Sequence, residues 1–534
     1  MTALRPELAG TGVLLRFALR RDRIRLPVWI VVAAALVGEQ SAASQAFYDT
    51  PQALAAYRAT VGTNPATIAL SGPPVGLYTV AGAVAFEISF SVILVAALMA
   101  MFTTVRHTRT DEEAGRTELL RAGGVGRHAP LAAAVALSAL GCLGMAAAIA
   151  AAAAGTGLPG QGSLLLGASV GAAGLVFTGP TAVAVQVSAA ARATYGLVMG
   201  VFLLAFGIRA IGDIQGNGVS WASPIGWAQA THPYSEDRAW PLLLCVLGTV
   251  VLLAGATALL DHRDLGAGLL APRPGAAAAP RSLLSPLGLA WRLQRGAVAG
   301  WGVGLVVLGA LYGGLGNSVE RLLADNSAAQ SFFPDAARAG LVNAYLAATL
   351  VVCALVATAF GVAAALRAHG EEAAGRVEPV LATATGRAAW LGSHATVALA
   401  GSAGLLAAAG LAMGAARAVT TGDIGDLAGL LGASLAHLPA VWLMTGLAVA
   451  LAGSAPRAAV PTAWALFAVV VVVTLFAQAL SWPRWVQDLS PLTWTPDLPA
   501  EEWTAGAGAA LLVGALALVV LGFAGMRRRD LTTG

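Results

Sequence analysis

Long apolar segments dominate this sequence and constrain its fold more than any other feature. A helix that crosses a bilayer needs about 20 mostly apolar residues. Twelve segments meet this requirement, at approximately 26–46, 79–105, 129–154, 163–190, 194–213, 240–260, 297–316, 341–366, 388–415, 427–453, 458–480 and 504–526. Charged residues make up only 11% of the chain, against about a quarter in ordinary soluble domains. We therefore predict an all-α membrane protein with twelve transmembrane helices.

The distribution of arginine predicts the orientation of these helices. The chain contains no lysine, so arginine carries all of the basic side-chain charge apart from histidine. Cytoplasmic loops of membrane proteins are enriched in basic residues. With both termini inside, few arginines are external or within a span: Arg58, Arg209, Arg238, Arg321, Arg338, Arg417 and Arg484. We expect a multi-pass protein of the cell membrane with cytoplasmic N- and C-termini.

The second half of the chain repeats the first. The segment Ser223-Pro224-Ile225-Gly226-Trp227 matches Ser490-Pro491-Leu492-Thr493-Trp494, and Arg263-Asp264-Leu265 matches Arg529-Asp530-Leu531. Each half has six spans, and an even number makes the two repeats parallel. We predict a first transmembrane domain at 1–265, a Pro/Ala/Gly-rich cytoplasmic linker at 266–286, and a second transmembrane domain at 287–534.

A basic segment precedes the first span of each half. Arg20 and Arg23 in the first half correspond to Arg292 and Arg295 in the second at one constant offset. A signal peptide can also begin with such a basic stretch, but the second copy lies in mid-chain, where no signal peptide is possible. Both copies are predicted to form an amphipathic helix on the membrane surface that leads into a span.

A charged loop occurs between the second and third span of each half. Glu112-Glu113-Ala114-Gly115-Arg116-Thr117-Glu118 recurs as Glu372-Ala373-Ala374-Gly375-Arg376-Val377-Glu378, and Arg127 and Arg387 close the two loops. On a helix, each glutamate would pair with the arginine four residues later. The glycines would allow another backbone to come close. The two copies favour a docking surface for a cytoplasmic partner over a solvated turn that only enforces topology.

Few polar side chains lie within the spans, and such residues are often functional. Glu87 is in the second span, whereas its counterpart in the second half is Ala347. Glu87 either contacts substrate or is a paired carboxylate near the outer surface. Arg209 and Asp213 are expected to form a helical ion pair. Weaker candidates for the pathway, which could equally be interhelical hydrogen bonds, are Gln186, Asn343 and Gln478.

Several chemistries are excluded or unsupported. A phosphate-binding loop needs a lysine, so this chain cannot hold nucleotide in that way. The cysteines, Cys142, Cys245 and Cys353, lie in apolar segments and are expected to pack between helices. The histidines are scattered, with His437 expected to be a hydrogen-bonded packing residue. We predict no metal site, no catalytic residues and no nucleic-acid partner.

The two Glu-x-x-Gly-Arg-x-Glu loops, the basic segments and the Pro/Trp external segments, in this order, resemble the permease subunits of type-2 ABC exporters. The specific resemblance is to the fused twelve-span permeases of actinobacteria, described as exporters of polyketide antibiotics and other drugs. It covers nearly the whole chain. It implies an ATP-driven exporter of hydrophobic or amphipathic compounds, such as antibiotics, drugs or lipids, in a bacterial plasma membrane.

The same resemblance implies a partner and a set of contact residues. Two copies of a separate ATPase would bind ATP and magnesium, while this chain would bind no cofactor. The charged loops would be coupling helices, with the basic surface helices also touching the ATPase. The coupling residues would be Glu112, Glu113, Gly115, Arg116 and Glu118 on one subunit, and Glu372, Gly375, Arg376 and Glu378 on the other. Ala373 and Pro379 depart from the first copy, so the two contacts would differ in strength.

Two other classes of protein remain as alternatives. Twelve spans in two parallel halves are also the plan of the major-facilitator transporters, which are driven by ion gradients. That class would be expected to carry several charged residues within its spans, but only Glu87 lies deep in one. A membrane-embedded transferase or protease lacks a plausible catalytic cluster at the membrane surface.

Overall fold

The computed structural model describes residues 7–48, 50–270, 277–324, 340–478, 482–501 and 505–530. This part of the chain is helical and contains no β-strand. Twelve of its helical segments are long and apolar enough to cross a membrane. The predicted all-helical fold with twelve spans is therefore confirmed, and the chain is a multi-pass membrane protein.

The chain forms two compact units, Met1–Gly275 and Ala276–Gly534. The division falls inside the segment predicted as a linker, of which residues 271–276 lie outside the described part. Each unit has its own large hydrophobic core, centred on Val92, Met145 and Phe177 in the first and on Leu350, Phe360 and Leu406 in the second. Each unit can therefore be described by itself.

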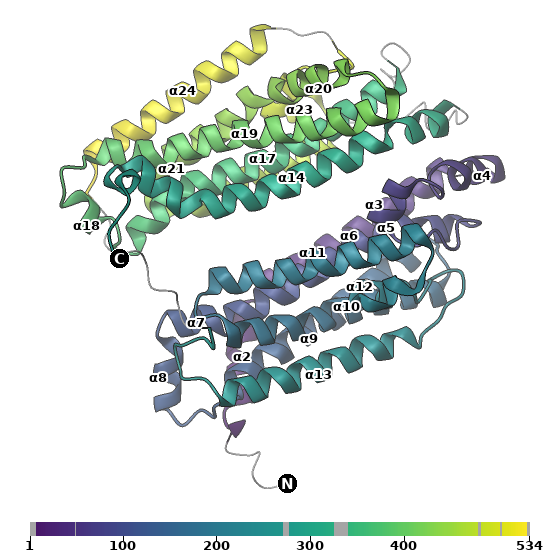
Figure 1. Cartoon of the computed structure of the whole chain (residues 1–534), viewed down its shortest axis with the longest axis horizontal. Helices are drawn as coiled ribbons and strands as arrows, with labels where there is room; N and C mark the ends of the chain where they lie inside the picture. Colours follow the sequence, from purple (N-terminus) through teal and green to yellow (C-terminus); the bar gives the residue numbers. More distant parts are fainter. Residues whose placement is uncertain are drawn as a thin grey trace. The chain divides into compact units, whose positions relative to one another are not determined.

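The first unit is a helical bundle with short helices at both ends (Figure 1). One end carries α2, α7 and α8, and the other carries α4, α5 and α12. Its elements are α2 (Thr11–Arg21), α3 (Arg25–Phe47), α4 (Pro51–Thr60), α5 (Pro65–Ser71), α6 (Val80–Arg106), α7 (Arg109–Glu113), α8 (Arg116–Ala122), α9 (Ala129–Gly155), α10 (Gly160–Val187), α11 (Ala191–Gln215), η1 (Gly218–Ala222), α12 (Pro224–Gln229) and α13 (Pro241–Asp261).

The second unit repeats much of this order. Arg529, the residue after α24, binds Glu372 near the end of α17, so that the described C-terminal segment lies beside the charged loop. Its elements are η2 (Arg281–Leu284), α14 (Pro286–Ala324), α17 (Leu341–Ala373), α18 (Glu378–Leu381), α19 (Arg387–Thr421), α20 (Gly425–Ala436), α21 (Leu438–Ser454), α22 (Pro456–Phe476), α23 (Arg484–Gln487), η3 (Pro491–Trp494) and α24 (Ala505–Arg528).

Local sequence signals explain where several helices begin and end. The hydroxyl of Thr79 accepts a hydrogen bond from the amide of Gly82 and caps α6, while Ser223 caps α12 ahead of a proline. Helix α11 stops at Gly216, whose φ of 61° is left-handed. His437, immediately before Leu438 and Pro439, separates α20 from α21 and divides the tenth predicted span.

The basic segments differ between the two units: the predicted helix before the first span is distinct in the first unit, whereas in the second it is continuous with the span. In the first unit, α2 ends at Arg21 and α3 begins at Arg25. The turn between them contains buried Asp22, whose carboxylate lies 2.7 Å from the ring of His107. The corresponding segment of the second unit forms the start of α14, which runs from Pro286 to Ala324 without a break. Gln294 occupies the position of Asp22 and stays helical.

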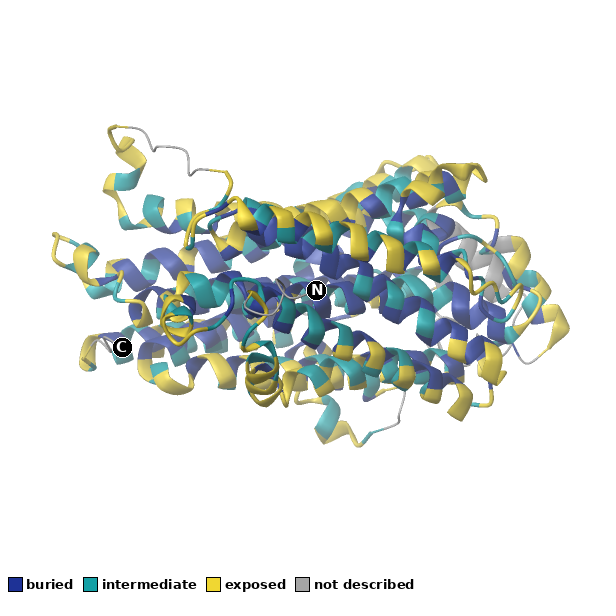
Figure 2. Ribbon diagram, turned by 90° about the horizontal axis from the view of Figure 1, so that it is seen from below, coloured by how far each residue is buried: buried dark blue, intermediate teal, exposed yellow. Residues whose placement is uncertain are grey.

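Exposed and buried residues alternate along the helices, as the yellow and dark blue bands of Figure 2 show. On α13 the exposed positions are large and apolar, such as Leu243, Leu247 and Val251. Helix α24 has the same character at Val513, Leu516 and Val520. Continuous apolar surfaces of this kind are unfavourable in water, so these faces are suited to contact with lipid.

Two glycines let α14 approach α19 closely. A Cβ atom on Gly309 would lie 2.5 Å from the carbonyl oxygen of Ala409, and one on Gly313 would lie 2.3 Å from that of Met413. Both distances are shorter than any allowed carbon–oxygen contact. The Gly-x-x-x-Gly spacing places both glycines on one helix face, where small residues permit tight packing in membranes.

We predict that Gly313→Ala lowers the melting temperature of the purified protein, because the added methyl group forces α14 away from α19. Overpacking of this kind costs about 1–3 kcal/mol. The matched control is Gly304→Ala on the same helix, where an added Cβ meets no atom within 4 Å. Thermal unfolding in detergent, followed by size-exclusion fluorescence, compares the two. Equal melting temperatures for both variants would contradict close packing at Gly313.

Candidate functional site

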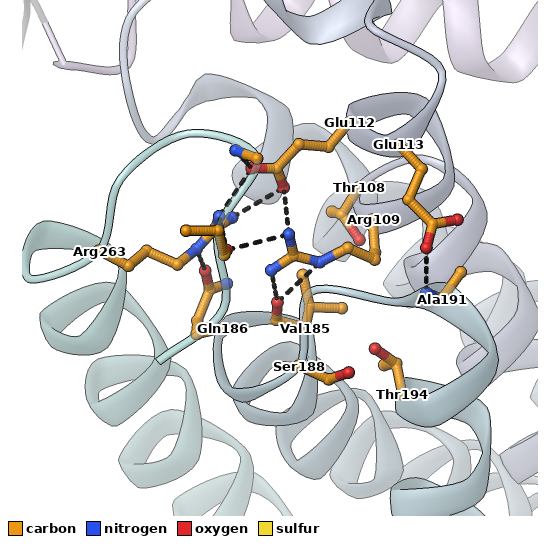
Figure 3. Close-up of polar contacts among 12 residues, drawn as sticks. Thr108, Arg109, Glu112, Glu113, Val185, Gln186, Ser188, Ala191, Thr194 and Arg263 are labelled. Carbon is orange, nitrogen blue, oxygen red and sulfur yellow. Dashed lines mark hydrogen bonds and ion pairs between the residues drawn. The ribbon is translucent and has the colours of Figure 1, made fainter. Parts of the chain in front are cut away.

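The charged loop of the first unit is anchored by Glu112, which has only 5% of its side chain exposed. Its carboxylate accepts hydrogen bonds of 2.6 and 2.9 Å from the guanidinium of Arg263, and one of 2.7 Å from the amide of Gly266. Arg109, one turn earlier on α7, lies 3.2 Å away (Figure 3). Bidentate pairing in a buried place is a strong and directional contact. Glu112 thus ties α7 to the segment after α13.

The two arginines around Glu112 also bind the end of α10. Arg109 donates to the carbonyl of Val185, and Arg263 donates to the side-chain oxygen of Gln186 over 2.6 Å (Figure 3). Carbonyl groups in the last turn of a helix have no partner within the helix, so a buried helix end needs such donors. Gln186 was predicted as a pathway candidate. Its amide instead belongs to this network, which is the interhelical role also considered for it.

Glu113 has a different structural partner. Its side chain is exposed in part, but one carboxylate oxygen accepts a hydrogen bond of 2.7 Å from the backbone amide of Ala191. Ala191 is the first residue of α11, and a carboxylate at a helix N-terminus is stabilised by the unpaired amides and by the helix dipole. Glu113 therefore links α7 to α11.

The second unit contains the same anchor. Glu372 is almost fully buried and forms a bidentate pair with Arg529, with the two N–O distances at 2.5 and 2.6 Å. Arg529 also donates to the carbonyls of Ala452 and Gly453 at the end of α21. In the first unit, Arg109 makes the corresponding contact with the backbone carbonyl of Val185 at the end of α10.

One further arginine completes each anchor. Arg127 donates to the backbone carbonyl of Arg263 over 2.7 Å, and Arg387 donates to that of Arg529 over 2.7 Å. Sequence comparison identified the loop glutamates, these closing arginines and the Arg-Asp-Leu segments as separate matches. It did not show that they join. No helical spacing connects residues so far apart in the chain, so only the tertiary structure reveals the pairing.

Arg116 and Arg376 do not pair with the glutamates four residues before them, which corrects the prediction. Arg116 binds Asp111, and Arg376 binds Glu371 at 2.7 Å, an interaction that raises the pKa of Arg376. The helix is interrupted between the charges by a glycine in each copy. Both Gly115 and Gly375 have a φ of 69°, and a Cβ on either would meet open space. The glycines are thus required for the left-handed turn. No other part of the described chain packs against them.

The outward surface of each loop is formed by other side chains. In the first unit, Leu119 is 78% exposed on α8, next to Leu120 and Glu118. In the second unit, Glu378 and Pro379 are exposed on α18. These residues are free to touch a partner, whereas Glu112 and Glu372 are held inside the fold.

Glu87 is held by several donors, and its side chain does not present a free charge. Its carboxylate accepts hydrogen bonds from Gln40 at 2.6 Å, from Ser44 at 2.8 Å and from the hydroxyl of Tyr48 at 2.8 Å. All three donors lie on or just after α3, whereas Glu87 lies on α6. These hydrogen bonds join α3 to α6 through Glu87, and a contact between Glu87 and substrate stays a prediction.

The other polar residues of the spans have mixed outcomes. Arg209 lies 3.4 Å from Asp213, as predicted, and also donates to the carbonyls of Ile68 and Leu70 at the end of α5. Asn343 is half-buried near the start of α17 and stays a candidate. Gln478 is exposed beyond the end of α22 and is not within a span. The three cysteines are buried and unpaired, and His437 is buried with one ring nitrogen 3.1 Å from the carbonyl of Ala433, both as expected.

The described part of the chain is thus a polytopic helical protein in which buried Glu–Arg pairs anchor the two charged loops. Residues 283–527 match the family described as "Multidrug efflux system permease Rv1217c, C-terminal domain". The chain is also 38% identical to the multidrug efflux system permease protein Rv1217c of Mycobacterium tuberculosis, over 98% of this chain and 95% of that protein. The chain belongs to this family of efflux permeases, and the resemblance drawn from its loops is confirmed.

We predict that Arg263→Ala lowers the melting temperature more than Arg116→Ala does. Removing one partner of a buried ion pair leaves an unpaired charge and costs about 3–5 kcal/mol, whereas Arg116 is 53% exposed and contributes little. The double variant Glu112→Gln with Arg263→Gln should recover part of the loss. Thermal unfolding of the full chain tests this. A melting temperature for Arg263→Ala equal to that of Arg116→Ala would disprove the anchoring role.

A second prediction tests whether the hydrogen bonds of Glu87 stabilise the folded chain. Glu87→Ala leaves the hydroxyls of Ser44 and Tyr48 without their acceptor, so we expect a loss of stability of about 1–3 kcal/mol. Glu87→Gln keeps an acceptor oxygen and should be milder. Melting temperatures are compared with Gln478→Ala as an exposed control. If Glu87→Ala unfolds like the wild type, its hydrogen bonds do not hold α3 to α6.

Proposed function

We propose that this chain is the transmembrane subunit of an ATP-driven exporter of hydrophobic or amphipathic compounds, and that it binds two copies of a separate ATPase. The family supports export of drugs, since the relative in Mycobacterium tuberculosis is named a multidrug efflux system permease. The observation that carries the proposal is the pair of anchored loops. Each has a buried Glu–Arg pair beneath an exposed surface, in matching places in the two units.

The exposed surfaces are the proposed docking sites. Leu119 and Leu120 offer apolar area in the first unit, and Glu118 adds a charge beside them. Pro379 replaces Leu119 in the second unit, so that contact has less apolar area to bury. Exposed arginines at the starts of the two units provide further charge for the same partner: Arg20, Arg23, Arg292 and Arg295.

The anchors supply a physical route for coupling. Glu112 joins the loop to the segment after α13, Arg109 joins it to α10, and Glu113 joins it to α11. A force applied by the ATPase on α7 and α8 therefore reaches three long helices through short, directional contacts. ATP and magnesium would bind to the ATPase subunits. ATP must bind more tightly to one state of the assembly than to the other for this force to arise.

The proposed arrangement in the membrane follows the repeat. Both units carry their anchored loop beside the end of their last long helix, which supports two parallel repeats with the loops and both termini on the cytoplasmic side. The substrate would enter from the cytoplasm or the inner leaflet. The ion-driven alternative would be expected to carry several charged residues within its spans, whereas in this sequence only Glu87 lies deep in one.

We predict that Leu119→Asp and Glu378→Arg each reduce assembly with the ATPase by about tenfold, without changing the melting temperature of the permease. Both side chains are exposed, so the folded chain loses nothing, while the docking surface gains an unfavourable charge. Co-purification with the partner ATPase subunit, and stimulation of its ATP hydrolysis, measure the effect.

The control is Leu284→Asp, which places the same charge on a side chain that is 79% exposed outside the two loops. Normal assembly is expected for it. If both loop variants assemble with the ATPase as well as the Leu284→Asp protein does, the loops are not the docking sites. A permease that binds no ATPase, and whose transport stops when the proton gradient is removed, would disprove the ATP-driven mechanism.

A further inference from the structure

A pocket of about 540 Å³ lies in the first unit between the α2–α3 turn, α6 and α11. Small-molecule sites commonly occupy roughly 300–1,000 Å³, so the pocket is large enough for a ligand. It is near the end of the unit that carries α7, because Thr110 of α7 also forms part of its wall. Neither the anchors nor the proposed docking surfaces use this pocket.

One side of the pocket is basic. Arg106 projects from the last turn of α6, and its Nε and Nη1 atoms are buried without a hydrogen-bond partner in the described part of the chain. Its nearest charge is the Oδ1 atom of Asp22, 3.5 Å from Nε and beyond a short hydrogen bond, while Oδ2 of the same carboxylate is bound to His107. Arg25 is exposed at the pocket's edge. Buried donors of this kind are costly to leave unpaired, so they favour an anionic ligand.

The charges of the wall do not cancel. Arg21 also lies in the wall, but its guanidinium is bound to Asp111 at 2.8 Å. Asp22 is the one carboxylate among the lining residues and is shared between Arg106 and His107. Arg25 and Arg106 together therefore exceed the single opposing charge, and a singly charged acid would neutralise the site.

The other side of the pocket is aromatic. The rings of Trp29 and Phe102 are stacked with centroids 6.1 Å apart, and Tyr195 follows at 5.3 Å from Phe102. All three belong to the wall. Three adjacent rings form a continuous apolar surface with the arginines at its margin. A ligand that fits this surface has an apolar body and an acidic head.

We propose that this pocket binds the acidic head group of an anionic amphipath, with its apolar body against Trp29, Phe102 and Tyr195. Arg25 and Arg106 would pair with the head group. Basic pockets between transmembrane helices are suited to acidic lipid head groups, and an acidic amphipathic compound has the same chemistry. This binding step stands independently of the ATPase.

The pocket is a property of the first unit. At the offsets that relate the two halves, Arg25 corresponds to Ala297 and Arg106 to Leu366, so neither charge is repeated. Trp29 corresponds to Trp301, which shows that the aromatic position is retained while the basic ones are not. One chain therefore binds one acidic head group in this way.

The experiment compares acidic ligands with neutral ligands that have the same apolar body, on the purified full chain. In one arm, native mass spectrometry counts phosphatidylglycerol against phosphatidylcholine retained from neutral detergent. In the other, fluorescence measures 1-anilinonaphthalene-8-sulfonate against uncharged N-phenyl-1-naphthylamine, in phosphatidylcholine nanodiscs with empty discs subtracted. The first arm detects a lipid as the ligand, and the second detects a free compound.

We expect the wild type to prefer the acidic member in at least one arm, and Arg25→Gln with Arg106→Gln to lose that preference by about 30-fold. This figure corresponds to roughly 1 kcal/mol for each basic group. Arg25→Gln alone, at an exposed position that folding does not require, should lose about fivefold. Arg25→Lys with Arg106→Lys should keep most of the preference.

The matched control is Arg457→Gln with Arg527→Gln, which removes the same charge from exposed positions of the second unit. It should bind like the wild type. The proposal is overturned if the wild type shows no acidic preference in either arm, or if the Arg25 and Arg106 variants keep the preference of this control. Neither outcome bears on ATPase binding, so the proposed function would be unaffected.

Discussion

The buried pairs Glu112–Arg263 and Glu372–Arg529 are the interactions on which the organisation of each unit depends. Each pair joins a loop between the second and third spans to the chain segment that follows the last span of the same unit. A buried ion pair is stable only when its remaining donors and acceptors are satisfied. Arg263 also donates to the side chain of Gln186 and to the carbonyl of Ala267, and Arg529 donates to the carbonyls of Ala452 and Gly453. These contacts therefore fix three parts of each unit relative to one another: the charged loop, the end of one inner helix and the segment after the last helix.

The two units share these anchors but differ around them. The helix is interrupted at Asp22, between α2 and α3, whereas α14 continues through the corresponding residue, Gln294. Glu87 fastens α3 to α6 in the first unit, where the second has Ala347. The basic pocket beside Arg106 has no counterpart at Leu366. A duplicated framework has thus kept the contacts that anchor its loops, while the surroundings of the spans have diverged.

Much of the fold could be predicted because its signals are local. The ends of α6, α9 and α13 fall within a residue or two of the predicted spans, since each follows from a run of apolar residues closed by polar ones. The predictions that failed depend on contacts between distant residues. Arg116 was assigned to Glu112 from helical spacing, but the left-handed turn at Gly115 and the presence of Asp111 and Arg263 changed both partners. Gln186 was considered for the pathway because its distance from Arg263 could not be seen.

The sequence by itself determined the class of fold, the number of spans, the duplication and the places of the two charged loops. These follow from hydropathy and from repeated residues, which need no knowledge of distant neighbours. Only the tertiary structure decided which loop residues face inward and which face outward. Glu112 and Leu119 lie in the same short loop, yet one is buried by Arg263 and the other is exposed. Burial depends on what the rest of the chain places alongside, and for Glu112 that is a residue from the far end of the unit.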